Sequence, residues 1–169
     1  MADLGFDGMI KVSFVPTILS VAAPKVTELN AAGAIPLEGR LTAEGLSISS
    51  ETADVDTSKL NSTANAGTIG RDTYTVGVTY VRGDSADTEA TKVQDGLIRG
   101  ASGYLVVRRD KVSTAAWAVA DKVEVYPVIC RRPNPAPPAP DTLQSVEVGM
   151  AVTDGNKVRA IDNPATMVA

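Results

Sequence analysis

The alternation of apolar and polar residues predicts a chain built mainly from β-strands. The clearest strand is residues 72–81, whose two faces are an apolar and aromatic set and a threonine set: Tyr74, Val76, Val78 and Tyr80 against Thr73, Thr75 and Thr79. Alternation also predicts a half-buried strand over residues 9–15, and apolar content predicts strands over 104–109 and 122–130. The predicted fold class is therefore mainly β, with antiparallel sheets that form a sandwich or a barrel-like body.

Residues 46–81 are predicted to form one long antiparallel hairpin with an elaborate tip. Residues 46–55 are β-like but polar, and they precede a stretch of small, polar and glycine-containing residues before the strand at 72–81. Such a tip has too little apolar area to offset its ordering entropy in a free subunit. We therefore predict that it is an inter-subunit assembly loop, with these candidate residues: Asn61, Ser62, Asn65, Thr68 and Ile69.

Two helices are predicted beside the strands. A short N-terminal helix begins at Pro24 and ends at Gly33. Residues 85–98 carry apolar side chains at helical spacing, with Asp84 or Ser85 as the cap, and this helix is expected to cover one face of a sheet. A helical turn is also predicted at residues 113–119, around Trp117.

A proline-rich run at residues 133–141 divides the chain. We predict a β core over residues 1–132, a stiff extended strap over 133–141, and a C-terminal β-hairpin over 142–169. The hairpin turns at Asp154-Gly155. The last 29 residues are too few for an independent domain, so the hairpin is expected to pack on the same domain or on a neighbouring subunit.

Composition favours assembly with other subunits. Aromatic residues make up only 4% of the chain, so the core is filled mainly by small aliphatic side chains and partners could supply missing burial. The strand start at residues 104–107 is apolar on both faces and needs cover on both. It is the candidate inter-subunit strand, comprising Tyr104, Leu105, Val106 and Val107.

The residue types exclude several classes of enzyme. The chain has no histidine and a single cysteine, Cys130, so it lacks Ser-His-Asp and Cys-His chemistry, His-containing zinc sites and intrachain disulfides. Cys130 is predicted to be a small buried hydrophobe, and the lack of a disulfide framework fits a reducing cytoplasm. No phosphate-binding loop or nucleophile elbow occurs. We predict a protein that is not an enzyme, with no catalytic, metal-binding or cofactor-binding residues and no cofactor.

Charge argues against a nucleic-acid-binding surface. The net charge is −4 and no cationic stripe is present, whereas sequence-independent binding needs several cationic phosphate contacts. Three acids lie close together in the polar β-like segment and are predicted to form a solvated acidic face: Glu51, Asp54 and Asp56. A calcium site or an acid–base pair is the alternative, but no loop with calcium-binding spacing surrounds them.

Two short motifs have simpler structural explanations. The tetrapeptide Arg82-Gly83-Asp84-Ser85 spells an integrin-recognition sequence, but it also fits a strand end, a turn and a helix cap. The triplet Asn61-Ser62-Thr63 matches an N-glycosylation acceptor, and polar loops produce such matches by chance. No apolar run approaches the length of a membrane span.

Three strings carry a resemblance to a known family. They are residues 100–110 (GASGYLVVRRD), residues 116–128 (AWAVADKVEVYPV) and the N-terminal run 8–15, which is followed by a proline-led helix. In this order they resemble the major tail (tail tube) proteins of long-tailed, non-contractile bacteriophages, especially those that infect actinobacteria. The resemblance covers most of residues 4–130.

That resemblance implies a β-sandwich with a flanking helix and a structural role in the virion tail. Six copies would form a homohexameric ring, and stacked rings would form a hollow tube that conducts the genome. Implied partners are further copies of the chain and other tail proteins (tape measure, terminator and baseplate), with assembly in the host cytoplasm. The acidic residues Glu51, Asp54 and Asp56 would then face the lumen, where negative charge lets duplex DNA slide without specific binding.

Two alternatives stay open at this point. One is another virion component: a tail terminator, a head–tail connector or a capsid decoration protein. The other is a non-viral β-sandwich binding or adhesin module, for which exposed aromatic residues are expected, whereas Trp117 is the only tryptophan.

Overall fold

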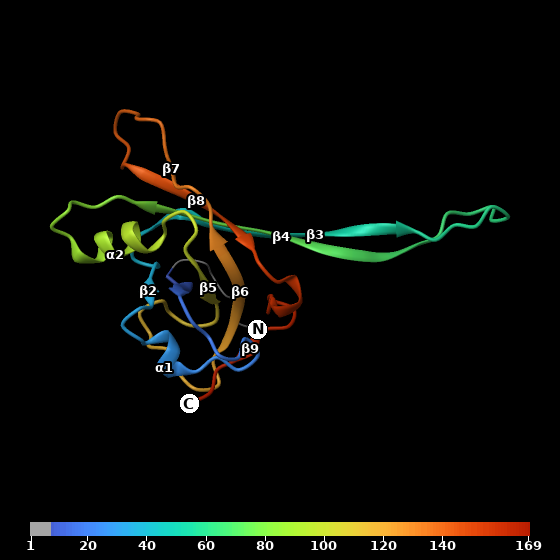
Figure 1. Cartoon of the computed structure of the whole chain (residues 1–169), viewed down its shortest axis with the longest axis horizontal. Coiled ribbons are helices and arrows are strands. Elements are labelled where there is room, and N and C mark those ends of the chain that lie inside the picture. The colour runs from blue at the N-terminus through green and yellow to red at the C-terminus, as the bar shows by residue number, and fades with distance from the viewer. Residues whose placement is uncertain (1–7) are drawn as a thin grey trace.

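The computed structural model of the chain describes residues 8–169 and shows a curved antiparallel β-sheet with a long projecting hairpin (Figure 1). The sheet order is β2-β1-β5-β6-β8-β4-β3, while β7 pairs with β8 and β9 pairs with β6. The strands are β1 (Lys11–Val15), β2 (Ile35–Pro36), β3 (Leu41–Asp56), β4 (Gly67–Val81), β5 (Ser102–Arg108), β6 (Lys122–Cys130), β7 (Asn134–Pro135), β8 (Ser145–Val152) and β9 (Ala165–Thr166). The predicted mainly β fold is confirmed.

The helices are short. They are α1 (Val26–Leu29), α2 (Thr88–Gly96) and a 3₁₀ turn, η1 (Gly155–Lys157). The flanking helix and the short N-terminal helix are therefore confirmed, but the cap of α2 is Asp87 and not Asp84 or Ser85. The Asp87 carboxylate accepts hydrogen bonds from the backbone N–H groups of Glu89 (3.1 Å) and Ala90 (3.2 Å). Residues 113–119 form turns and no helix.

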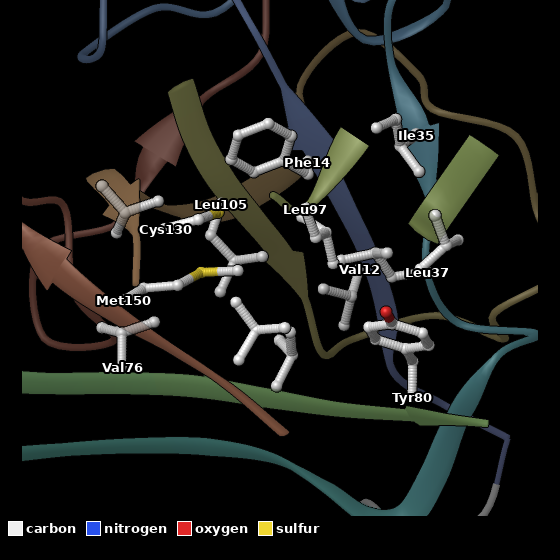
Figure 2. Close-up of a cluster of buried hydrophobic side chains, with 14 of the residues drawn as sticks. Val12, Phe14, Ile35, Leu37, Val76, Tyr80, Leu97, Leu105, Cys130 and Met150 are labelled. Atoms are coloured by element: carbon white, nitrogen blue, oxygen red, sulfur yellow. The ribbon is translucent and has the colours of Figure 1, made fainter. Parts of the chain in front are cut away.

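One main core lies on the concave face of the sheet. It takes alternate residues from five strands, and α2 closes it with Val93 and with Leu97 at its C-terminal end. Figure 2 shows ten of these side chains pointing toward one another: Val12, Phe14, Ile35, Leu37, Val76, Tyr80, Leu97, Leu105, Cys130 and Met150. Cys130 is buried, as predicted, and burial raises the pKa of its thiol to about 11.

A second core covers the other face of β1, β5 and β6. Val15, Val106 and Val125 point into it, and loops, α1 and β9 supply the opposing side chains: Ile18, Leu29, Trp117, Ala165 and Met167. The middle strands are therefore apolar on both faces because each face has its own cover within the subunit.

The C-terminal region differs from the predicted strap and hairpin. After β6, the chain continues along β8 through β7, where Asn134 pairs with Glu147 and Pro135 pairs with Val146. The prolines thus occupy one side and the tip of a second projecting hairpin, residues 131–145, which we call the Pro-rich hairpin (Figure 1). Strand β8 lies between β6 and β4, inside the sheet. Asp154-Gly155 begins the 3₁₀ turn, and no second strand returns along β8 from residues 157–161.

The Arg82–Ser85 tetrapeptide is part of the connection from β4 to α2. A Cβ atom at Gly83 would lie 2.4 Å from the Ala90 Cβ, so only glycine fits beneath the helix here. Arg40, just before β3, forms an ion pair with the capping residue Asp87. These contacts give the tetrapeptide a structural role in docking α2.

Candidate assembly surface

The β3–β4 hairpin is confirmed, and its outer half projects as an isolated two-stranded arm. We call residues 49–73 the arm, because every residue in it except Gly70 is exposed. The register runs from Glu51 opposite Thr73 to Asp56 opposite Gly67, with a bulge at Gly70–Arg71 opposite Ala53. Figure 1 shows the arm extending far beyond the body of the subunit. A partner that touched the arm would therefore not need to touch the core.

The predicted assembly loop lies at the end of this arm. Asn61, Ser62 and Asn65 are in the tip between the strands, whereas Thr68 and Ile69 belong to β4. The tip is held by local bonds alone, such as Thr57 N–H to the Ala66 carbonyl (2.9 Å) and the Ser62 hydroxyl to the Ala64 carbonyl (2.6 Å). Hydrogen bonds from Ser58 to Asp56 also lower the pKa of that carboxyl.

The arm carries apolar side chains that nothing in the subunit covers. Ile69 is 78% exposed, and Leu60 and Val55 are also exposed. Of these, only Ile69 was among the sequence candidates. The signal for Leu60 and Val55 was their place as large aliphatic residues among small polar ones. Uncovered apolar residues on a projecting element are typical of an interaction surface.

The three acids of β3 do not form a single face. The bulge places its extra residue in β4, so alternation along β3 continues unbroken. Asp54 and Asp56 therefore share one face, and Glu51 lies on the other. All three are exposed, and the grouping of all three as one acidic wall does not follow from the structure.

The candidate inter-subunit strand is an interior strand. Tyr104, Leu105, Val106 and Val107 lie in β5, which pairs with β1 on one edge and β6 on the other. Leu105 and Val107 point into the main core, and Val106 into the second. The two-sided apolar pattern that suggested a missing partner is thus satisfied inside the subunit. The long free edge of the sheet is that of β3, which pairs with β4 only, and the two-residue strand β2 ends the sheet on the other side.

A buried charged cluster, which the sequence reasoning missed, fixes the loop after β5. Arg108 has no exposed side-chain area, and its guanidinium donates to the Asp121 carboxylate (2.7 Å) and to three carbonyls, those of Val112, Ala115 and Ala116. The guanidinium also lies over the Trp117 ring, 5.2 Å from its centroid. The sequence did carry a signal, since alternation puts Arg108 on the same buried face as Val106.

Asp121 is ionised in this cluster. Burial alone would raise its pKa, but hydrogen bonds from Lys111, Arg108 and the Ala118 N–H outweigh burial and hold the pKa below its ordinary value. The side chains of Arg108 and Asp121 are fully buried, and apart from the Arg108 Nε their polar atoms bind within the cluster. We therefore interpret this buried ion pair as structural: it stabilises the conformation of the loop over residues 109–121.

No site with a cofactor-binding arrangement stands out in the part of the chain that the structure describes. Within residues 8–169, no three Asp, Glu or Cys side chains gather as a metal site would require. None of the described helices has the length and apolar content to cross a membrane. The arm and the Pro-rich hairpin are two prominent projecting elements with exposed surface that the subunit itself does not cover.

Comparison with known proteins agrees with an assembly role. A family model described as phage tail tube protein matches residues 2–162. A search of curated proteins gives no match. Among solved structures, a chain of the anti-feeding prophage baseplate, determined by cryo-electron microscopy and 6-fold symmetrised, has a similar fold. The TM-score is 0.56 at 7% sequence identity, over 91% of this chain and 95% of that chain.

Proposed function

The chain belongs to the phage tail tube protein family and is a structural protein of the virion tail, and from this premise we propose that it is the tube subunit itself. Copies form closed rings, the rings stack into a hollow tube, and the tube conducts the genome of a long-tailed, non-contractile phage. The chain has no catalytic role in this proposal. Assembly takes place in the host cytoplasm, and the other tail proteins (tape measure, terminator and baseplate) are its further partners.

The observation that carries this proposal is the arm. Its strands extend for eight residues beyond the body, from 49 to 56 on β3, or roughly 26 Å at the rise of a β-strand. A monomer gains nothing from an element of this length with uncovered Val55, Leu60 and Ile69. An arm that reaches a neighbouring ring gives each such residue a surface to cover it. Six-fold symmetry in the solved baseplate favours a hexameric ring.

The proposal predicts concentration-dependent self-association into tubes. Analytical ultracentrifugation over a wide concentration range, with electron microscopy of the same samples, is the measurement. Tubes are the expected product. Single rings that never stack would favour a terminator or connector, and a monomer at every concentration and salt condition would contradict the proposal.

The tube is also expected to let duplex DNA pass without holding it. The net charge of each copy is −4, so a hexamer carries −24, and a negative lumen repels phosphates. Because Glu51 lies on a different face from Asp54 and Asp56, these three residues do not form one acidic wall. The expected repulsion of DNA depends on the net charge of the ring. A gel-shift assay at low ionic strength should show no retardation of duplex DNA, and tight binding that salt removes would contradict it.

A further inference from the structure

The Pro-rich hairpin presents two cations that the subunit does not use. Arg131 and Arg132 are exposed at its base, and neither makes an ion pair among residues 8–169. Arg131 is anchored by its N–H to the Gly149 carbonyl (2.8 Å), and its side chain crosses the face of β8 above Gly149. Beside it, a hollow of about 280 Å³ runs across β3, β4 and β8 over the paired residues Gly77 and Gly149.

This hairpin cannot accept another strand by extending the sheet. Its outer side carries prolines at 133, 135, 137, 138 and 140, which have no N–H to donate. A partner must therefore be recognised by its side chains, and the hairpin offers two guanidinium groups at its base, with exposed Leu143 and the single carboxylate of Asp141 near its tip, while Glu147 of β8 lines the hollow beside Arg131. The partner that fits is a projecting element with carboxylates and apolar side chains.

The arm has that chemistry. It carries the acids Glu51, Asp54, Asp56 and Asp72 against the bases Lys59 and Arg71, which gives a net charge of −2. Strand β3 carries four acids and no base along its 16-residue free edge. Two arms would repel each other, and the same holds for two Arg131–Arg132 surfaces. Charge complementarity therefore favours contact between the arm of one copy and the Arg131–Arg132 end of the Pro-rich hairpin of another.

We propose that the arm, through Asp54 and Asp56, docks on the Arg131–Arg132 surface of a second copy. The proposal rests on the tube function and identifies the two surfaces that hold neighbouring copies together. Since the two surfaces differ, the contact is head-to-tail, and such contacts continue from copy to copy unless a ring closes. The acidic edge also blocks the wrong, symmetric pairing of two β3 strands.

Charge reversal tests the pairing. The variants are R131E/R132E, D54K/D56K, and the chain carrying all four changes. Each double variant places like charges together, so we expect the critical concentration for tube formation to rise at least about tenfold. The quadruple variant, which carries all four changes, restores opposite charges, and its critical concentration should lie within about threefold of the wild-type value. The matched control is K92E/R99E, which makes the same charge change at exposed sites on and just after α2 and should assemble normally.

The outcomes separate this inference from the tube function. If the wild type forms no tubes, the proposed function fails. If it forms tubes and R131E/R132E assembles like K92E/R99E, the docking surface is wrong. If both double variants lose tubes and the quadruple variant does not regain them, the two surfaces do not contact each other. As a measurement without variants, assembly of the wild type should weaken as salt rises from 0.05 M to about 0.5 M, because the contact is exposed to screening; salt-independent assembly would overturn the inference.

Discussion

Replacement of Asp121 by alanine is expected to destabilise the subunit by about 3–5 kcal/mol, because it leaves the Arg108 guanidinium buried without its counter-charge. Arg108 and Asp121 both have fully buried side chains, so water cannot replace the lost partner. Since whole domains have only about 5–15 kcal/mol of stability, a large part would be lost. Urea denaturation followed by circular dichroism measures the change.

Lys111→Ala is the matched control. Lys111 also binds Asp121, but 48% of its side chain is exposed, so its loss should cost less than about 1 kcal/mol. If D121A is no less stable than K111A, the buried Arg108–Asp121 pair contributes little to the stability of the subunit. The same carboxylate predicts acid sensitivity. Because its folded pKa is lowered from 3.8, its contribution is complete above that value and disappears as pH falls through the folded pKa.

Removing the arm is expected to abolish tubes while leaving the subunit folded. In this variant an Asn-Gly turn replaces residues 53–71 and joins Thr52 to Asp72, which face each other in the hairpin. The removed residues are exposed, apart from Gly70, and none belongs to either core. The far-ultraviolet spectrum and a cooperative melt should persist, and electron micrographs should show no tubes.

A second variant separates the arm's length from its apolar side chains. Replacing Val55, Leu60 and Ile69 with serine keeps the hairpin but removes the uncovered apolar area. We expect weakened assembly without a change in melting temperature beyond a few degrees. Normal tubes from the truncated chain would show that the arm is dispensable, and failure of the truncated chain to fold would place the arm in the folding unit.

The arm could be predicted from sequence because local patterns determine it. Alternation over residues 72–81 and the polar strand before it define a hairpin without any long-range information. The helix α2 was predictable for the same reason, although its cap was placed two or three residues too early because several acids and a serine compete for that position.

What local patterns could not reveal was which strands become neighbours. The two-sided apolar pattern of β5 is the same whether a partner subunit or the chain's own second core covers it. Likewise, the proline run is a clear break in composition, but nothing in its sequence indicates that β7 pairs with β8. The Arg108–Asp121 pair depends on the conformation of the loop after β5, and the two-residue alternation of a β-strand does not encode that conformation.

The position of β8 has a consequence for the order of folding. Strands β3 and β4 join the rest of the sheet through β8 alone, and β8 is synthesised after β1, β3, β4, β5 and β6. Until residue 152 leaves the ribosome, the nascent chain can pair β1 with β5 and β5 with β6, and can close the β3–β4 hairpin, but it cannot connect the two parts of the ladder. Contacts between distant segments also make folding slow. If copies polymerise as proposed, this delay would keep a subunit without β8 out of the growing polymer, and synthesis of β8 would set the earliest moment at which assembly can begin.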